Sequence, residues 1–223
     1  MKINADFTQR ASAHAATTPW AASPMAGVER RMLDRVGEEV ARATTIVRFA
    51  PNSSFSAHTH GGGEEYLVLE GVFQDEDGDF PVGSYVRNPP TSRHTPSAAE
   101  GCTIFVKLCQ FDPDDRCAVR IESAAQTPAP AEGRRGVGVI PLHRDAREDV
   151  RIETWAPGAR VALDAPGGLE ALTISGGFSE SGEAFAAQSW LRLPPGGRLD
   201  AVAGPEGARV WIKTGHLKDL AAA

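Results

Sequence analysis

Short apolar segments recur along the chain, separated by glycine and proline. Between residues 28 and 111 they fall at 28–36, 39–51, 65–73, 84–90 and 102–111. They are rich in Val, Ile, Phe and Tyr and are bounded by turn residues, a pattern typical of β-strands rather than helices. Gly37 and the glycines at 61–63 stand where the chain must reverse. The pattern predicts an all-β domain.

The same order of segments returns in the second half. ATTIVRFAP at 43–51 resembles DVRIETWAP at 149–157, and SYVRNPP at 84–90 resembles SWLRLPP at 189–195. LVLEG at 67–71 is matched to LTISGG at 172–177, and FVK at 105–107 to WIK at 211–213, so that the offset is 105 or 106 residues throughout. We predict an internal duplication of an antiparallel jelly-roll barrel.

The duplication sets the predicted domain boundaries. We expect an N-terminal extension at 1–19, a first barrel at 20–123, a linker at 124–136 and a second barrel at 137–223. The linker is small, Pro-rich and charged, as exposed linkers are. The extension is rich in Ala and Thr, so we expect it to be loosely structured or draped over a partner.

Composition narrows the class of protein. Hydrophobic residues at 41% and charged residues at 23% are ordinary globular values, and the 23 glycines and 16 prolines favour short strands joined by turns. A net charge of −6 argues against a nucleic-acid surface. No apolar run approaches the ~20 residues that cross a bilayer, and no secretory signal is present. Three cysteines without a C-x-x-C pair fit a reduced compartment. We predict a cytoplasmic protein with neither nucleic-acid nor membrane partners.

Candidate metal ligands cluster in the first half. His58 and His60 are two residues apart, so on a strand both imidazoles face the same side. The glycines at 61–63 allow a tight reversal, after which Glu64 can face back toward them. His94, just after the prolines at 89–90, offers a third imidazole. Imidazole and carboxylate ligands suit zinc, iron, manganese, nickel or copper, so we predict one divalent transition metal.

Neighbouring residues have competing interpretations. Glu65 is the alternative to Glu64, but alternation along a strand should turn it outward. Tyr66 shares a face with Glu64 and either lines the cavity or packs in the core. Arg87 is expected to be a solvated charge, and the acidic residues at 75–79 a solvated hairpin turn.

The spacing of the ligands resembles the two motifs of the cupin superfamily, G-x5-H-x-H-x3,4-E-x6-G and G-x5-P-x-G-x2-H. In this chain they read His58-x-His60-x3-Glu64-x6-Gly71 and Gly83-x5-Pro89-x4-His94. Pro51 stands near the first glycine of the family pattern, and Thr91 replaces the glycine of the second motif. Neither departure removes a ligand.

More narrowly, residues 19–112 resemble the cupin domain of ChrR-type anti-sigma factors. GGGEEYLVLEGVFQDEDGDFPVGSYVRNPPTSRHTP and GCTIFVK carry the likeness. It implies two tandem cupin barrels (a bicupin of the double-stranded β-helix type), zinc ahead of iron, manganese or nickel, and a regulatory or stress-sensing role. The same subgroup includes dioxygenases that cleave acetylacetone or dihydroxyacetophenone. An iron-dependent dioxygenase of a small diketone or hydroxyaryl ketone is therefore one alternative, and another small-molecule cupin enzyme, such as an isomerase, is a second.

The resemblance also bears on partners. ChrR-type anti-sigma factors hold the sigma factor through an N-terminal helical domain with an H-x3-C-x2-C zinc motif, whereas here no cysteine precedes Cys102. We therefore expect no sigma-factor binding. A small-molecule ligand and a second copy of the chain, as in a homodimer, are the expected partners.

The second copy is expected to have lost the metal. Applying the offset places Asp164, Pro166, Glu170 and Leu199 opposite the four ligands, so only Glu170 keeps its residue type. One or two carboxylates make a poor transition-metal site. The remaining histidines, at positions 14, 143 and 216, lack partners at ligand spacing and are expected at the surface.

Overall fold

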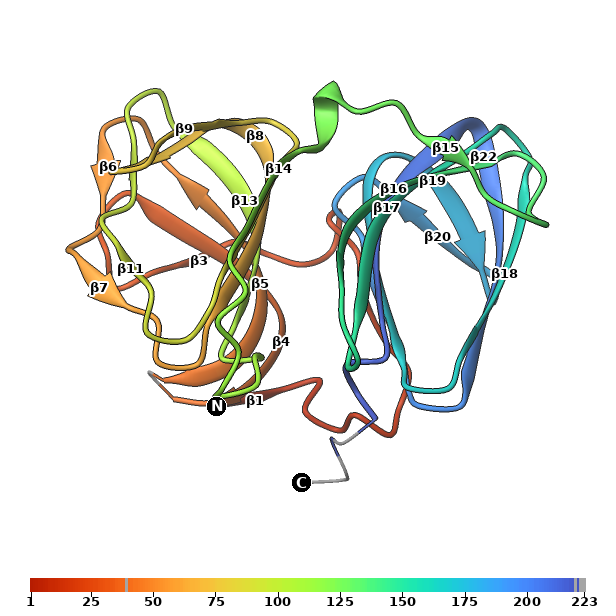
Figure 1. The fold of residues 1–223 in the computed structure, drawn as a ribbon, viewed down its shortest axis with the longest axis horizontal. Helices are drawn as coiled ribbons and strands as arrows, with labels where there is room; N and C mark the ends of the chain where they lie inside the picture. Colours follow the sequence, from red (N-terminus) through yellow and green to blue (C-terminus); the bar gives the residue numbers. More distant parts are fainter. Residues whose placement is uncertain (39, 219, 221–223) are drawn as a thin grey trace. The chain divides into compact units, whose positions relative to one another are not determined.

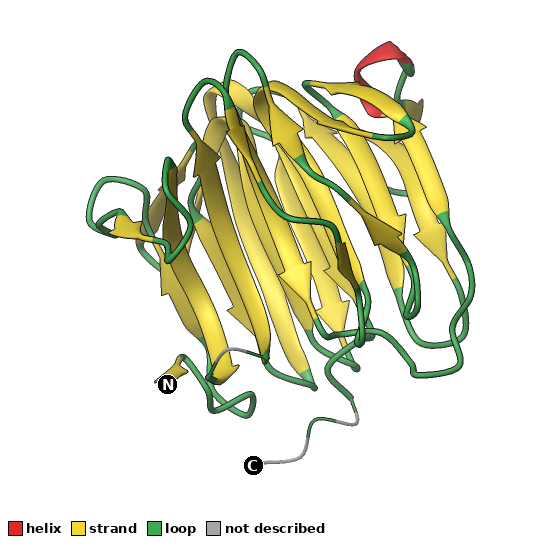
Figure 2. Ribbon diagram, turned by 90° about the vertical axis from the view of Figure 1, so that its left-hand side faces the viewer, coloured by secondary structure: helices red, strands yellow, loops and turns green. Residues whose placement is uncertain are grey.

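The computed structural model describes residues 1–38, 40–218 and 220, and these residues form two compact units. The first unit consists of Met1–Ala5 and Pro19–Ala125, and the second unit of Asp6–Thr18 and Gln126–Ala223. The described residues form 22 β-strands and one short 3₁₀ turn, η1 (Ser123–Ala125), but no α-helix (Figures 1 and 2). The predicted all-β, two-barrel architecture is confirmed. Residues 39, 219 and 221–223, which fall in the predicted strand at 39–51 and in the predicted second barrel, lie outside the described residues.

The first unit is an antiparallel barrel whose main sheet has the order β1-β4-β5-β13-β8-β10-β14. Strands β9 and β12 pair with β8, β6 pairs with β12, and β7 and β11 pair with each other. The strands are β1 (Lys2–Ile3), β3 (Ala21–Ala22), β4 (Val28–Gly37), β5 (Ala41–Phe49), β6 (Ser53–Ser54), β7 (His58–Thr59), β8 (Glu64–Asp75), β9 (Gly78–Pro81), β10 (Ser84–Asn88), β11 (Arg93–His94), β12 (Ser97–Ala98), β13 (Cys102–Leu108) and β14 (Val119–Glu122).

The second unit repeats this plan in the order β15-β16-β17-β22-β19-β21-β2, with β18 paired to β22 and β20 to β19. Its strands are β2 (Ala11–Ala13), β15 (Ala129–Pro130), β16 (Val137–Arg144), β17 (Asp149–Trp155), β18 (Arg160–Ala165), β19 (Leu169–Glu180), β20 (Glu183–Ala186), β21 (Trp190–Leu193) and β22 (Gly197–Thr214).

Backbone pairing fixes how the two units correspond. Gly71 of β8 lies opposite Cys102 of β13, and Gly176 of β19 lies opposite Ala208 of β22. Both glycines have positive φ, +69° and +66°, and a Cβ on either would clash with the carbonyl oxygen of a second glycine. Gly71 therefore corresponds to Gly176 with an offset of 105 residues. The sequence match to Gly177 was wrong by one residue, because two adjacent glycines, Gly176 and Gly177, lie within this strand and the sequence alone does not choose between them.

The N-terminal segment is part of the second unit rather than a loosely structured extension. Its strand β2 pairs with β21, in the place that β14 takes beside β10 in the first unit. The side chain of Phe7 is buried, with the Arg192 guanidinium 4.3 Å from its ring centroid. Arg10 forms a 2.7 Å ion pair with Glu180. Residues 6–18 therefore complete the edge of the second barrel, which the predicted boundary at residue 19 did not foresee.

This packing predicts that Phe7→Ala destabilises the protein by about 3 kcal/mol, because the change opens a cavity in a buried aromatic site. The melting temperature should fall by roughly 6–12 °C for a chain of this size. Gln9→Ala, which truncates an exposed side chain of the same segment, is the matched control and should leave the melting temperature unchanged. Equal melting temperatures for the two variants would show that the segment does not support the second unit.

Candidate metal centre

Strand pairing places two of the predicted ligands opposite each other. β7 and β11 are antiparallel, and His94 is the direct register partner of His58. The pairing continues one residue further, where the His60 amide donates to the Ser92 carbonyl at 2.9 Å and its carbonyl accepts from the Thr91 amide at 2.9 Å. The three imidazoles therefore come from one short, hydrogen-bonded ribbon.

A glycine turn brings Glu64 to the same place. A Cβ on Gly63, whose φ is +76°, would clash with the ring of Phe111, and a Cβ on Gly62 would lie 2.7 Å from the Cα of Cys109. No other residue type fits this close approach, after which Glu64 begins β8.

The four predicted ligands form one cluster. A ligand atom from each of His58, His60, Glu64 and His94 lies within 4.8 Å of the others. Glu64 Oε2 is 3.3 Å from His60 Nε2 and 3.5 Å from His94 Nε2. His58 is exposed at the rim, while the other three are buried. It is the only such group of His, Cys, Asp or Glu found among the described residues.

Each imidazole is oriented through its Nδ1 atom. Nδ1 lies 3.0 Å from the Ser56 carbonyl oxygen in His58, 3.0 Å from Ser92 Oγ in His60 and 3.1 Å from Asp75 Oδ2 in His94. Such contacts fix the ring and leave Nε2 for a metal. The prediction of a solvated turn at 75–79 is wrong for Asp75, whose side chain is only 3% exposed. Sequence reasoning missed Asp75 and Ser92 because such partners have no fixed spacing from the ligands.

Two buried nitrogen atoms on the inner face of the cluster lack a hydrogen-bond partner among the described residues. Nε2 of His60 and Nε2 of His94 are buried and make no hydrogen bond with the described residues. Burial lowers the pKa of His60 to about 3 and also lowers the pKa of His94, so both rings are neutral at pH 7. Burial raises the pKa of Glu64 to about 7. Neutral imidazoles with converging lone pairs fit a divalent cation, which would satisfy both orphan nitrogens and favour the charged carboxylate.

An apolar cavity of about 890 Å³ adjoins the cluster within the first unit. His58, His60 and Glu64 form part of its wall. Most of the remaining wall is apolar, with Val28, Val47, Phe49, Phe55, Phe73, Ile104, Val106 and Leu108. The site therefore faces a space large enough for a small organic molecule.

The structure resolves the competing interpretations of Glu65 and Tyr66. Glu65 is not part of the ligand cluster, but the expectation that it faces outward was wrong, because its side chain is buried beside its register partners Lys107 and Arg87. Tyr66 packs in the core with its ring 4.8 Å from that of Phe73, and it is not among the residues that line the cavity. Burial raises the pKa of its hydroxyl.

The expectation of a solvated Arg87 was wrong. Its side chain is 1% exposed, forms a 2.7 Å ion pair with Asp115 and stacks at 4.1 Å on the ring of Phe111. A buried arginine paired in this way stabilises the chain that follows β13 against β10, and no feature of the local sequence announces the pairing.

The second unit carries aliphatic residues at all four ligand positions. The Gly196 amide donates to the Ala165 carbonyl at 2.9 Å, as Thr91 does to His60, so Ala165 corresponds to His60. Leu163 pairs with Leu199 as His58 pairs with His94, and Leu169 pairs with Leu193 as Glu64 pairs with Asn88. These counterparts, Leu163, Ala165, Leu169 and Leu199, belong to or pack against the apolar core of the second unit.

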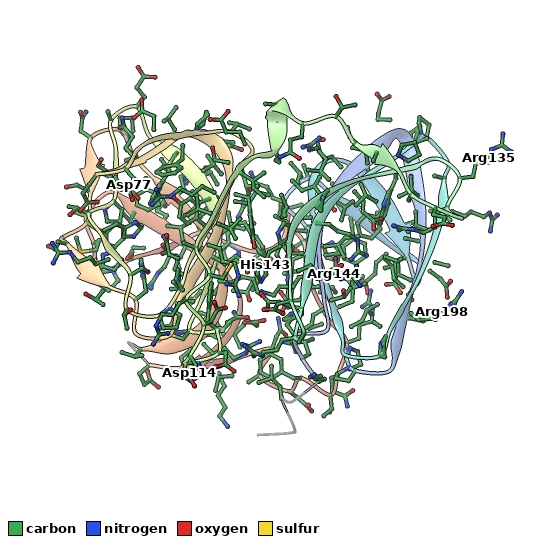
Figure 3. The ribbon with its side chains drawn as sticks, viewed as in Figure 1. Asp77, Asp114, Arg135, His143, Arg144 and Arg198 are labelled. Atoms are coloured by element: carbon green, nitrogen blue, oxygen red, sulfur yellow. The ribbon has the colours of Figure 1, made fainter. Side chains whose placement is uncertain are left out.

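Of the four predicted counterparts, Leu199 is correct and the other three are wrong by one residue, but the correct residues are equally unable to bind a transition metal. Asp164 is 77% exposed and paired with Arg198, which is labelled in Figure 3. Glu170 corresponds to Glu65 rather than Glu64, and it lies 2.9 Å from His216 Nε2. His216 is therefore a buried partner of a carboxylate and not the surface histidine that we expected.

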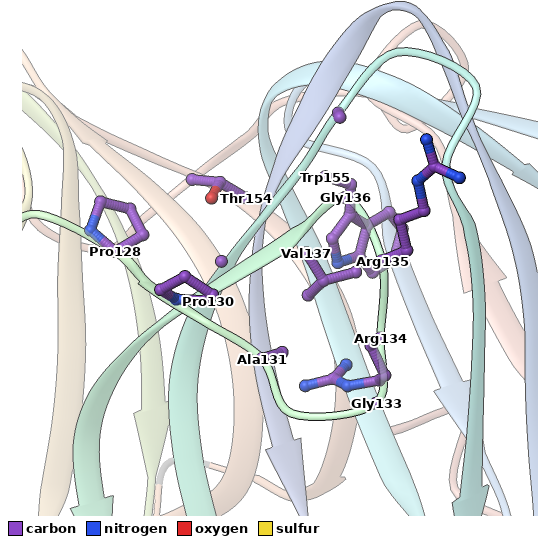
Figure 4. Close-up of a pocket in the computed structure, with 12 residues that line it drawn as sticks. Pro128, Pro130, Ala131, Gly133, Arg134, Arg135, Gly136, Val137, Thr154 and Trp155 are labelled. Atoms are coloured by element: carbon purple, nitrogen blue, oxygen red, sulfur yellow. The ribbon is translucent and has the colours of Figure 1, made fainter.

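The second unit also has an open pocket of about 940 Å³ between β15, β16 and β17, shown in Figure 4. Prolines, small residues and the arginines Arg134 and Arg135 line it, and Arg134 pairs with Glu153 at 2.8 Å. Its described lining contains no histidine, cysteine or carboxylate, so it offers no metal site.

Thr91 occupies the position where the cupin pattern has glycine, and it keeps the glycine conformation. Its φ is +77°, close to the +79° of its counterpart Gly196. A β-branched residue is strained in this region. The backbone amide of Thr91 donates the hydrogen bond that holds His60 in place. Pairing between the segments that carry His60 and Thr91 therefore keeps Thr91 in the left-handed conformation.

Comparison with solved structures finds the same fold in other proteins. A candidate dioxygenase from Nostoc punctiforme has 14% identity and a TM-score of 0.76, covering 96% of this chain and 86% of its own. A bacterial pirin from Escherichia coli in complex with nickel(II) has 12% identity and a TM-score of 0.68, covering 92% and 98%. A variant of oxalate decarboxylase from Bacillus subtilis has 13% identity and a TM-score of 0.63, covering 92% and 77%. At these identities the likeness concerns the fold.

The fold and the cluster define a bicupin with one His₃Glu group. Residues 8–112 match the family model described as "ChrR Cupin-like domain". This first half is therefore a ChrR cupin-like domain by its sequence, and the chain as a whole has the two-barrel cupin fold. No curated protein matches it. In the described part of the chain there is no helix long and apolar enough to cross a membrane.

The strain at Thr91 predicts that Thr91→Gly stabilises the protein. Removing about 1–2 kcal/mol of left-handed strain outweighs the added freedom of glycine in the unfolded chain, so unfolding should require about 0.5–1 kcal/mol more. The reverse change in the second unit, Gly196→Thr, should destabilise. Urea denaturation of both variants measures the effect, and a Thr91→Gly protein that is less stable than wild type would contradict it.

The geometry further predicts about one metal per chain. His60→Ala and His94→Ala should each lower metal content sharply and abolish the rise in melting temperature that bound metal gives. His143→Ala is the matched control, since His143 lies outside the cluster. Elemental analysis of protein purified without added metal provides the measurement. Two ions per chain, or full occupancy in a His60/His94 double variant, would contradict the assignment.

Proposed function

We propose that the first unit binds one divalent transition metal through His58, His60, Glu64 and His94 and uses it to convert a small organic molecule. The single observation that carries this proposal is the apolar cavity of about 890 Å³ whose wall includes three of the four ligands. A closed structural site would have no use for such a space, whereas a substrate could reach the metal from it.

We assign the reaction to the dioxygenases, acting on a small diketone or hydroxyaryl ketone. Bound to these four residues, a redox ion such as iron(II) would supply dioxygen activation, which zinc cannot do. The similarity to the Nostoc punctiforme candidate dioxygenase supports this class. Other small-molecule reactions, such as isomerisation, need the same cavity but no oxygen.

The protein's own residues would prepare the site. Asp75 accepts a hydrogen bond from Nδ1–H of His94. Ser92, whose hydroxyl donates to the Pro89 carbonyl at 2.6 Å, accepts from Nδ1–H of His60 and so orients that ring. The aromatic rings of Phe49, Phe55 and Phe73 keep water away from a bound substrate.

A regulatory or stress-sensing role is the second candidate, and the match of residues 8–112 to the ChrR cupin-like family carries it. In that role a metal, with zinc foremost and iron, manganese or nickel as alternatives, would bind a signal molecule without turnover. We expect neither a sigma factor nor a nucleic acid nor a membrane as a partner in either role. A homodimer and a cytoplasmic location remain our proposals.

Oxygen consumption separates the two roles. Protein reconstituted anaerobically with iron(II) should consume dioxygen in the presence of acetylacetone or a dihydroxyacetophenone, and the zinc form should not. Glu64→Gln should lower the rate at least about tenfold, since it removes the negative ligand. Glu65→Gln is the matched control and should keep most of the activity if it folds.

Two outcomes would contradict the enzymatic role. One is zinc as the sole metal of the purified protein together with no oxygen uptake after iron exchange, which would leave the sensing role. The other is equal turnover by the Glu64→Gln variant and wild type, which would place the reaction elsewhere.

A further inference from the structure

The cavity beside the metal ligands contains an arginine, Arg30, that has no acidic partner among the described residues. Arg30 of β4 lines the cavity, and its strand neighbour Val47 is part of the same apolar wall. Arg30 Nε is buried and makes no hydrogen bond with the described residues. No ion pair between Arg30 and a described carboxylate is found either. In contrast, Arg48 on the adjacent strand pairs with Glu29.

Charge in the cavity is biased toward the positive. Arg35 also lines it, but its guanidinium donates to the Glu38 carbonyl and its charge interacts with the Glu38 carboxylate, so Arg30 is the cation of the cavity without a counter-ion among the described residues. Among the described lining residues Glu64 is the single acidic one, and it is committed to the metal cluster. A bound divalent ion would add further positive charge. Burial, followed by the nearby charge of Arg35, lowers the pKa of Arg30, as expected for a cation without a counter-ion.

We propose that Arg30 binds the carboxylate of a small apolar monocarboxylic acid whose alkyl or aryl body fills the cavity. The inference rests on the proposed function in one respect, namely that the molecule held by Arg30 is the one presented to the metal. It narrows the substrate of that function to a ketone that also carries a carboxylate, and it adds an anchoring residue and a direction of binding.

The chemistry of the wall favours this class over others. A guanidinium offers paired donors that match the two oxygens of a carboxylate, and the match is strongest away from water. Phe49, Phe55 and Ile104 suit an apolar body. A sugar would leave many hydroxyls unsatisfied against such a wall, and a phosphate ester would bring more charge than one free guanidinium satisfies.

The test is the binding of 3-phenylpropionate and of its neutral amide, 3-phenylpropionamide, measured by titration calorimetry. Both metal-free and zinc-loaded protein are used, so that turnover does not interfere. The acid should bind at least about tenfold more tightly than the amide, because the amide lacks the charge-assisted pair. Arg30→Ala should remove that preference. Arg30→Lys should keep part of it, because lysine retains the positive charge but lacks the paired donors of the guanidinium.

Arg48→Ala is the matched control, because Arg48 does not line the cavity, and it should bind the acid as wild type does. Metal content, measured in every variant, separates the two proposals. If the protein never takes up metal but still binds the acid in a way that depends on Arg30, the proposed metal-dependent function is wrong and the proposal that Arg30 binds a carboxylate is supported. Equal binding of acid and amide, unchanged binding by folded Arg30→Ala protein, or no binding of either probe would overturn the anchor.

Discussion

The convergence of three imidazole nitrogens and one carboxylate at the end of the first barrel is the constraint on which the rest of this unit depends. Ligand atoms from four residues lie within 4.8 Å of one another, although two of the nitrogens are buried without a hydrogen bond. Such an arrangement is costly unless a cation completes it. The surrounding chain holds it through three Nδ1 contacts, a glycine turn and a threonine in the left-handed region.

The second unit shows what the same backbone becomes without that requirement. Its counterparts of the four ligands are Leu163, Ala165, Leu169 and Leu199, and the position of Thr91 is the glycine Gly196. Aliphatic side chains there extend the core, so the unit needs no cation for its interior. A carboxylate that remains nearby, Glu170, bonds to His216 and Trp190 instead. The first unit therefore contains a candidate metal site where the second unit has apolar core.

Much of this could be predicted from the sequence. Hydrophobic alternation and turn residues predict the strands. The short spacing of His58, His60 and Glu64 predicts that these three side chains converge, because it depends on strand alternation and one turn, and the resemblance to the second cupin motif adds His94. The residues matched to the ligands in the second half were mostly wrong by one position, because only strand register decides between an offset of 105 and one of 106 residues. Asp75, Arg87 and the N-terminal strand were missed for a related reason. Their partners are distant in the chain, and a charged or Ala-rich sequence gives no sign of burial.

The most direct test of the central claim is the anomalous diffraction of a crystal of the purified protein, recorded above and below the absorption edge of its metal. The account predicts one peak per chain, about 2.0–2.2 Å from Nε2 of His58, His60 and His94 and from a carboxylate oxygen of Glu64, with no peak in the second unit. A peak elsewhere, or a metal-loaded crystal in which this cluster binds nothing, would contradict it.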